Sequence, residues 1–248
     1  MTLLIKNCRI LINNKIYVKN ILIKNGKISK ITNKEPKAGR ILDVKNNFVL
    51  PGLIDVHVHM REPGLTHKED FLTGSFAAAK GGVTTILDMP NTLPPTTTIA
   101  ALEEKRKLAA KSIVNYGFHF GATSDNISDI KKMKNIAAVK LYMDYTTGDL
   151  KVDDFEVISD ILKISKLAIV HAEDESIKNV VDILIKNKIK NRLHVAHVSS
   201  AKELGYAKHN KINNQITVEV TPHHLFMNQN DLQHLGAFAE MKPRLKTE

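Results

Sequence analysis

An alternation of strand-like and helix-like stretches, beginning at Phe48, most constrains what this chain of 248 residues can fold into. Apolar runs of strand character alternate with helical stretches over about 180 residues. Such repeats build a parallel sheet with helices on its faces, either open and doubly wound or closed into a (β/α)8 barrel. The predicted strands are FVLPGLIDVHVHM, TTILDMPN, VNYGFHFGAT, AAVKLYMDY, LAIVHAED, RLHVAHVSS and ITVEVTPHHLF.

Polar residues at the carboxyl ends of nearly all these strands favour the barrel. Barrel active sites are assembled from several strand ends at once, whereas an open sheet places its site at one switch point. The chain also has no GxGxxG segment, the phosphate-binding signature of open dinucleotide-binding sheets. We therefore predict an α/β fold of the TIM type, with seven of the eight strands that close a (β/α)8 barrel.

The first 50 residues have a different character. Their strand-like runs are separated in part by Asn-Asn and Asn-Gly pairs, which favour hairpin turns. We therefore predict a small β subdomain at residues 1–50, followed by the incomplete barrel at residues 51–248.

The composition narrows the class of partner and the compartment. The net charge is +10, but the lysines are scattered and aromatic residues make up only 5%, so we interpret the lysines as a solvated surface and expect no nucleic-acid partner. Cys8 is the single cysteine, which excludes an internal disulfide and fits a reducing compartment. Lys6 and Arg9 interrupt the apolar N-terminus, and no apolar run approaches the ~18 residues of a membrane span. We expect a cytoplasmic protein without membrane association.

The stretch IDVHVHMREPG raises the first candidate site. Side chains alternate along a strand, so Asp55, His57, His59 and Arg61 are predicted to share one face. Two imidazoles at neighbouring positions of one face can grip a metal ion. The structural alternative is a pair of hydrogen-bonded histidines in the core. For an HxH motif taken by itself, this alternative is favoured over metal binding.

Histidines at other strand ends strengthen the metal interpretation. His171 ends the strand LAIVHAED, and His194 and His197 both lie in RLHVAHVSS. Because a spacing of three puts those two on opposite faces, we expect only one of them to enter the barrel. His197 lies nearer the carboxyl end and is the inward candidate, which leaves His194 a structural role. Together with His57 and His59, His171 and His197 would then make four histidines that converge from three strands.

Lys140 is unusual because it lies in the middle of the apolar strand AAVKLYM. A buried ammonium beside metal cations is strongly disfavoured. The side chain would be deprotonated, paired with an acid, or converted by CO2 into a carbamate whose two oxygens can bridge two metal ions. A snorkelling or salt-bridged lysine is the structural alternative, and spacing alone favours it.

Two further strand ends carry polar residues for which the sequence allows more than one role. Asn91 follows the strand TTILDMPN and either binds a ligand or shapes the turn before Leu93. The adjacent histidines of TPHHL, His223 and His224, would lie on opposite faces of a strand, so at most one could face the site.

Together these motifs resemble the dihydroorotases of the amidohydrolase superfamily. The resemblance is carried by GLIDVHVHMREPGLTHKEDFLTGSFAAAKGGVTTILDMPNTLPPT and by VKLYM, VHAED, HVAHVSS and EVTPHHL in the family's order, from about Phe48 to Met241. It implies a zinc-dependent cyclic amide hydrolase of pyrimidine biosynthesis that interconverts N-carbamoyl-L-aspartate and L-dihydroorotate. Allantoinases and hydantoinases are the alternatives, but they usually lack the arginine that follows the histidine pair.

The resemblance also implies roles for the candidate residues. His57 and His59 would bind the more buried of two zinc ions and His171 and His197 the other, with carboxylated Lys140 as the bridge.

Some relatives use an aspartate as the bridge, for which Asp144 or Asp149 is the substitute here. Arg61 and Asn91 would hold the substrate carboxylate, a task that suits a planar, forked guanidinium.

The chain departs from the family pattern towards its carboxyl end. The family's catalytic aspartate lies in a D-x-A-P-H segment of the eighth strand, which does not occur here, so no catalytic acid or base is identified. Lys242 also stands where the family's substrate segment commonly has asparagine. We therefore expect a piece of a family member that is inactive as it stands. The alternative is a non-catalytic subunit that assembles with aspartate carbamoyltransferase; a second copy of the chain is the other expected partner.

Overall fold

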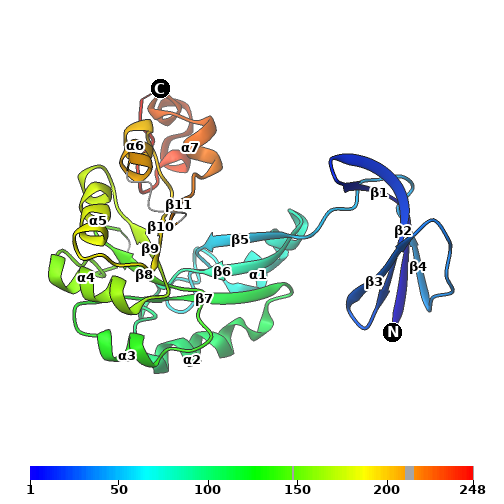
Figure 1. The fold of residues 1–248 in the computed structure, drawn as a ribbon, viewed down its shortest axis with the longest axis horizontal. Helices are drawn as coiled ribbons and strands as arrows, with labels where there is room; N and C mark the ends of the chain where they lie inside the picture. The colour runs from blue at the N-terminus through cyan, green and yellow to red at the C-terminus, as the bar shows by residue number, and fades with distance from the viewer. Residues whose placement is uncertain (147, 210–214, 248) are drawn as a thin grey trace. The chain divides into compact units, whose positions relative to one another are not determined.

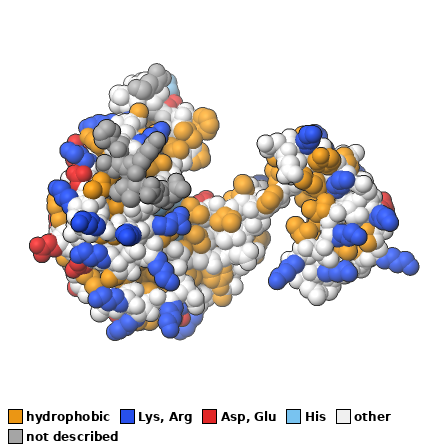
Figure 2. All heavy atoms as spheres, in the orientation of Figure 1, with side chains coloured by type: hydrophobic (Ala, Val, Ile, Leu, Met, Phe, Trp, Pro, Cys, Tyr) orange, Lys and Arg blue, Asp and Glu red, His pale blue; other side chains and the backbone are white. Residues whose placement is uncertain are grey.

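The computed structural model describes residues 1–146, 148–209 and 215–247. The chain divides into two compact units, Met1–Leu53 and Ile54–Glu248 (Figure 1). Lys and Arg side chains are spread over both units on the face drawn in Figure 2, with hydrophobic side chains between them.

The first unit is a four-stranded sheet with the strand order β3-β2-β1-β4. Its strands are β1 (Thr2–Ile12), β2 (Lys15–Lys24), β3 (Lys27–Thr32) and β4 (Arg40–Asp43). Strand β2 pairs antiparallel with β1 and β3, and β4 pairs parallel with β1. The tight turns fall at Asn13-Asn14 and Asn25-Gly26, which all have positive φ, as hairpin turns of this kind require. Cys8, Ile10 and Ile21 form the core of this small sheet.

The second unit confirms the predicted barrel-type fold. Its strands are β5 (Leu53–Val58), β6 (Val83–Asp88), β7 (Asn115–Gly121), β8 (Ala138–Tyr142), β9 (Leu167–His171), β10 (Arg192–Val195) and β11 (Ile216–Val218). They form one sheet in sequential order, and each described pair from β6 to β11 is parallel. The sheet curls into part of a barrel, with β5 and β11 as its two edge strands (Figure 1).

The predicted helices lie between these strands. They are α1 (Phe71–Lys80), α2 (Ile99–Leu108), α3 (Ile127–Lys132), α4 (Phe155–Ile164), α5 (Glu175–Lys186) and α6 (Ala201–His209), with the short 3-10 helix η1 (Ala109–Lys111) after α2. Ile158 and Ile161 of α4, like Ile177 and Val180 of α5, are fully buried in the large core between helices and sheet. Their three-residue spacing puts one apolar stripe of each helix on the sheet.

The other face of the sheet carries the polar residues. The register pairs Lys140 with Ile169, Ile169 with His194, and His194 with Thr217. Because paired residues of neighbouring strands share a face, Lys140 and His194 lie on the same inner face.

The last predicted strand, ITVEVTPHHLF, is only partly correct. Strand β11 ends at Val218, and the helix α7 (Pro222–Phe226) follows, with the Thr221 side chain as its N-cap and proline in its first turn. The expectation that His223 and His224 lie on opposite faces of a strand is therefore wrong. The chain continues through η2 (Gln229–Asp231), α8 (Leu232–Leu235) and η3 (Gly236–Ala239). Across the described residues, no helix is both long and apolar enough to span a membrane.

Candidate functional site

A pocket of about 530 Å³ lies at the carboxyl ends of the strands in the second unit. Five predicted site residues line it: His57, His59, Arg61, Asn91 and His197. They belong to or follow β5, β6 and β10, so the topology collects residues that are far apart in the sequence. Parallel strands place their carboxyl ends on one rim, and this is the rim where barrel sites form.

The four predicted imidazoles lie against one another. Ring centroids are 5.4 Å apart for His57 and His59, 5.3 Å for His57 and His197, and 4.7 Å for His171 and His197. The Nδ1 atom of His171 and the Nε2 atom of His197 are 2.8 Å apart, within hydrogen-bond range. In the part of the chain that the structure describes, no three His, Cys, Asp or Glu side chains surround a common point where an ion could sit. The rings therefore lie next to one another, but they contact each other and neighbouring residues instead of surrounding a common ion position.

Backbone conformation, rather than strand alternation alone, brings two of these residues to the pocket. Strand β5 ends at Val58, and Arg61 has a left-handed backbone with φ of 61°. Strand β10 ends at Val195, and His197 is also left-handed, with φ of 39°. This backbone conformation is uncommon for residues other than glycine, and both residues that adopt it here line the pocket.

Asn91 and Arg61 occupy different surroundings within the pocket. Asn91 is buried, and its Oδ1 lies 2.8 Å from Nδ1 of His59, so it orients that ring. One terminal nitrogen of the Arg61 guanidinium is buried without a hydrogen-bond partner among the described residues. A buried unpartnered donor of this kind is suited to an anionic ligand.

Lys140 is 1% exposed, and its Nζ has no hydrogen-bond partner among the described residues. It is therefore neither salt-bridged nor snorkelling, and the structural alternative for this residue is wrong. Its Nζ lies 5.3 Å from the centroid of the Tyr142 ring. Burial lowers the pKa of Lys140 to about 7, although the charge of Glu219 opposes the shift. Burial thus favours the uncharged amine over the ammonium.

The two aspartates considered as substitutes for Lys140 lie elsewhere. Asp144 accepts hydrogen bonds from the backbone N–H of Glu173 at 2.8 Å and from the Ser176 hydroxyl at 3.2 Å. Asp149 is exposed, and neither aspartate lines the pocket.

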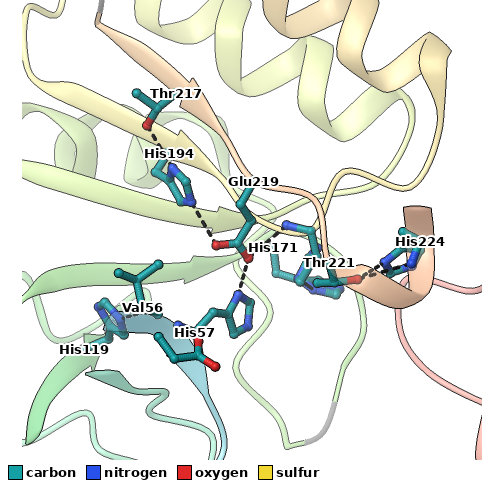
Figure 3. A network of polar contacts seen from close by, with 11 residues as sticks. Val56, His57, His119, His171, His194, Thr217, Glu219, Thr221 and His224 are labelled. Carbon is teal, nitrogen blue, oxygen red and sulfur yellow. Dashed lines mark hydrogen bonds and ion pairs between the residues drawn. The ribbon is translucent and has the colours of Figure 1, made fainter. Parts of the chain in front are cut away.

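Glu219 is a site residue that the sequence analysis missed. Its carboxylate contacts Nδ1 of His57 and lies 3.0 Å from Nε2 of His194 (Figure 3). It also accepts a hydrogen bond from the backbone N–H of His197 at 3.1 Å. Burial raises the pKa of Glu219, but the contacts with His194 and His57 outweigh burial and hold it below its usual range. Because His57 is in β5 and Glu219 follows β11, this carboxylate connects the two edges of the curled sheet. The sequence signal that could have identified Glu219 is its position as an acidic residue near the carboxyl end of the apolar run ITVEV.

His194 requires a correction as well. The expectation that only one of His194 and His197 reaches the interior is wrong, because the His194 ring contacts Glu219 and the His197 ring lies against those of His57 and His171. His194 is on the inner face with Lys140 by register, and its Nδ1 also lies 2.8 Å from the Thr217 hydroxyl. His197 reaches the same place because its left-handed backbone follows the end of β10.

The electrostatics keep several of these imidazoles neutral. Burial, reinforced by Lys140, lowers the pKa of His171 to about 3 and lowers that of His197 further. Burial and the nearby His57 hold the pKa of His59 well below its ordinary value. Neutral imidazoles have a free lone pair and are the form that binds metal ions.

Comparisons with known proteins agree with this architecture. The family described as Dihydro-orotase-like matches residues 46–190. A dihydroorotase of Methanosarcina acetivorans is 36% identical over 286 residues, an alignment that covers 98% of this chain and 61% of the relative. The multifunctional protein CAD of Squalus acanthias is 38% identical over 210 residues, which cover 80% of this chain and 9% of that protein. Among solved structures, an L-hydantoinase (dihydropyrimidinase) from Arthrobacter aurescens superimposes with a TM-score of 0.89 at 25% identity, over 99% of this chain and 64% of that one. The chain thus spans less than two thirds of the length of these dihydroorotase and hydantoinase relatives.

Proposed function

Because the chain belongs to the dihydro-orotase-like family, we propose that it serves a zinc-dependent cyclic amide hydrolase that interconverts N-carbamoyl-L-aspartate and L-dihydroorotate in pyrimidine biosynthesis. The observation that carries the proposal is the meeting of His57, His59 and His197 with Arg61 at one pocket. Relatives named dihydroorotase support the choice of substrate, and the hydantoinase likeness supports hydrolysis of a cyclic amide.

The residues present fit a zinc site. Nε2 of His171, Nδ1 of His197 and Nζ of Lys140 are all buried without a hydrogen-bond partner among the described residues. With His57 and His59, these side chains would hold the metal. Bound zinc would supply a water acidic enough to act as a nucleophile near neutral pH and would polarise the ring carbonyl.

Lys140 would contribute an anion to this site. An uncharged amine can attack CO2, which forms an N–C bond and releases one proton to give a carbamate. A pKa of about 7 makes the uncharged form available at neutral pH, because burial disfavours the ammonium. The carbamate oxygens are metal ligands, whereas the ammonium is not.

Arg61 and Asn91 would hold the substrate through its carboxylate. The Arg61 guanidinium offers a buried donor to an anion, and a planar fork suits two carboxylate oxygens. Asn91 orients His59 through Oδ1, and its amide N–H groups are the donors it would offer to the same carboxylate. This pair favours the anionic dihydroorotate over a neutral hydantoin.

The test combines zinc binding with turnover. The chain, and a longer version that carries the family's eighth-strand aspartate, are freed of metal with a chelator and loaded with zinc in bicarbonate buffer. Zinc content is measured for both, and hydrolysis of dihydroorotate and of hydantoin is assayed with the longer version. We expect zinc uptake by both and zinc-dependent hydrolysis of dihydroorotate by the longer version, with uptake and hydrolysis sharply reduced by Lys140→Ala. The control is Lys107→Ala, since Lys107 is an exposed lysine of α2. Turnover that survives chelation, or unchanged zinc content in Lys140→Ala, would contradict the proposal.

A non-catalytic assembly subunit is the second candidate. The related segment of Squalus CAD makes up 9% of a protein named as multifunctional, so a similar domain occurs inside a larger polypeptide. In this case the longer version, loaded with zinc, would turn over neither cyclic amide, and the chain would bind purified aspartate carbamoyltransferase. Preferential hydrolysis of hydantoin would instead indicate a hydantoinase-type enzyme.

A further inference from the structure

One buried histidine has no part in the proposed chemistry, yet it contacts the strand that carries the predicted ligands. His119 lies in β7, is 1% exposed, and has its Nε2 3.0 Å from the backbone oxygen of Val56 in β5 (Figure 3). Strand β6 separates β7 from β5 in the sheet. The side chain therefore reaches past one whole strand to the backbone of the next.

The contact fixes which nitrogen of His119 carries the proton. A backbone carbonyl only accepts hydrogen bonds, so Nε2 must be the donor. Nδ1 then has a lone pair, and this atom is buried without a hydrogen-bond partner among the described residues. Burying an unpartnered polar atom is unfavourable, so an apolar side chain would fill the same space at lower cost. The contact with Val56 is what distinguishes histidine from such a side chain.

The peptide group that His119 contacts leads directly into His57. The Val56 oxygen belongs to the peptide between Val56 and His57, and the N–H of that peptide donates to Oδ1 of Asp55 at 3.0 Å. Side chains therefore hold both ends of this peptide group. The direction in which the His57 ring projects depends on the orientation of this peptide, because the peptide is bonded to the Cα atom of His57. Strand β5 is an edge strand, so a neighbouring strand fixes it on one side only.

We infer that His119 is a positioning residue for the zinc site, acting on His57 through the Val56 carbonyl. The inference rests on the proposed function, because it assigns His119 to the metal site proposed above. Partners outside the ligand shell that fix a ligand's orientation typically change metal affinity by about 10–100-fold. Removal of the His119 donor acts one step further away, so we expect about a tenfold loss.

The experiment measures zinc affinity by competition with a chromophoric chelator, together with thermal unfolding of the metal-free chain. The variants are His119→Leu, which removes the donor, and His119→Gln, which restores an N–H near the same place. The control is Gln215→Leu, because Gln215 donates to the backbone oxygens of Ile189 and Asn191, both at 2.6 Å, at the opposite ends of the strands.

We expect about tenfold weaker zinc binding in His119→Leu, recovery in His119→Gln, and lower thermal stability with unchanged zinc affinity in Gln215→Leu. The inference is overturned if His119→Leu binds zinc as the unchanged chain does, if His119→Gln is as weak as His119→Leu, or if Gln215→Leu loses as much affinity. An unchanged chain that takes up no zinc would overturn the proposed function, and the positioning role with it.

A second measurement covers the case in which His119→Leu does not fold. Long-range nitrogen–proton correlation spectra of the unchanged chain report the tautomer of each histidine. We expect the Nε2–H tautomer for His119. The Nδ1–H tautomer, or a ring that exchanges rapidly between tautomers, would overturn the inference without any variant.

Discussion

Replacement of Lys105 by methionine is expected to destabilise the chain strongly, although Lys105 lies outside the pocket. Its Nζ is 2.8 Å from Oδ2 of Asp88 and 3.0 Å from the oxygen of Met89, and the two charged side chains are 0% and 1% exposed. Oδ1 of Asp88 in turn accepts the backbone N–H of Met60 at 2.7 Å. The ion pair thus holds the segment between His59 and Arg61.

The magnitude follows from what the substitution leaves behind. Methionine fills a similar volume, so the cavity term is small. Asp88 would remain buried without its counter-charge, and breaking a buried pair in this way costs about 3–5 kcal/mol. Neutralising both partners, as in Lys105→Met with Asp88→Asn, should recover about 2 kcal/mol, because no unpaired charge remains.

Urea unfolding followed by far-UV circular dichroism measures this loss, since the chain has no tryptophan for fluorescence. With a slope of about 2 kcal/mol per molar urea, the midpoint should fall by about 2 M. The matched control is Lys163→Met on α4, where Nζ is 3.0 Å from Asp160 but the side chains are 49% and 57% exposed. This exposed pair should contribute less than about 1 kcal/mol. Equal effects in Lys105→Met and Lys163→Met would refute the reasoning.

The loss should also depend on pH with a definite sign. Burial raises the pKa of Asp88 and Lys105 opposes that shift, so Lys105→Met raises it further. A carboxyl with a raised folded-state pKa stabilises the fold fully below its unfolded pKa and loses that contribution as pH rises through the folded value. The deficit of Lys105→Met should therefore be smallest at acidic pH and increase as the pH is raised from about 4. A deficit that grows on acidification would contradict this account.

Three further changes test other parts of the fold. Glu219→Gln keeps the size of the side chain but weakens its contact with His57, so the free energy of unfolding in urea should fall by about 1–3 kcal/mol. An unchanged midpoint would mean that other contacts hold the two sheet edges together. Gly64 has φ of 82°, and an added Cβ would lie 2.0 Å from the Leu93 oxygen. Gly64→Ala should therefore lower the free energy of unfolding by about 3 kcal/mol in the same assay. A neutral effect would show that the turn can relax. The chain should self-associate through its open sheet edges, and Ile54→Lys on β5, where Ile54 is 63% exposed, should reduce concentration-dependent light scattering without changing the circular dichroism; equal scattering would place the association elsewhere.

The strands and helices of the second unit could be predicted because apolar periodicity is a local property of the sequence. All seven predicted strands appear, and helices follow the first six. The prediction failed where local signals conflicted. In ITVEVTPHHLF the apolar spacing suggested one long strand, but Thr221 and Pro222 supply an N-cap and a first helical turn, and a helix forms.

The candidate site could be predicted only as far as strand alternation applies. His57 and Lys140 are placed by their strands, and both occupy the expected region. Alternation misjudged His194 because the spacing argument extended the strand through His197, whereas β10 stops at Val195. A left-handed residue just past a strand end redirects its side chain, and no periodic pattern reports that.

Ion pairs between residues far apart in the sequence were the hardest feature to predict from the sequence. The link between Glu219 and His57 joins residues 162 apart in the sequence, and the one between Lys105 and Asp88 depends on how α2 packs on β6. Each member alone is an ordinary charged residue in the sequence. Only the assembled sheet reveals that one pair acts on His57 in β5 and the other on Met60, just after the end of that strand.

The charges on the inner face connect these observations. Glu219 has its pKa held low by His194 and His57, and its charge also acts on His197 and Lys140, whose charged forms are disfavoured by burial. Divalent cations placed among such groups would lower the pKa of Lys140 further, because like charges repel. An uncharged Lys140 would relieve that repulsion, and a carbamate would reverse it by supplying a negative charge. The absence of any acidic hydrogen-bond partner for Lys140 among the described residues, which is unfavourable for an ordinary buried lysine, is therefore what a site that recruits its anion from CO2 requires.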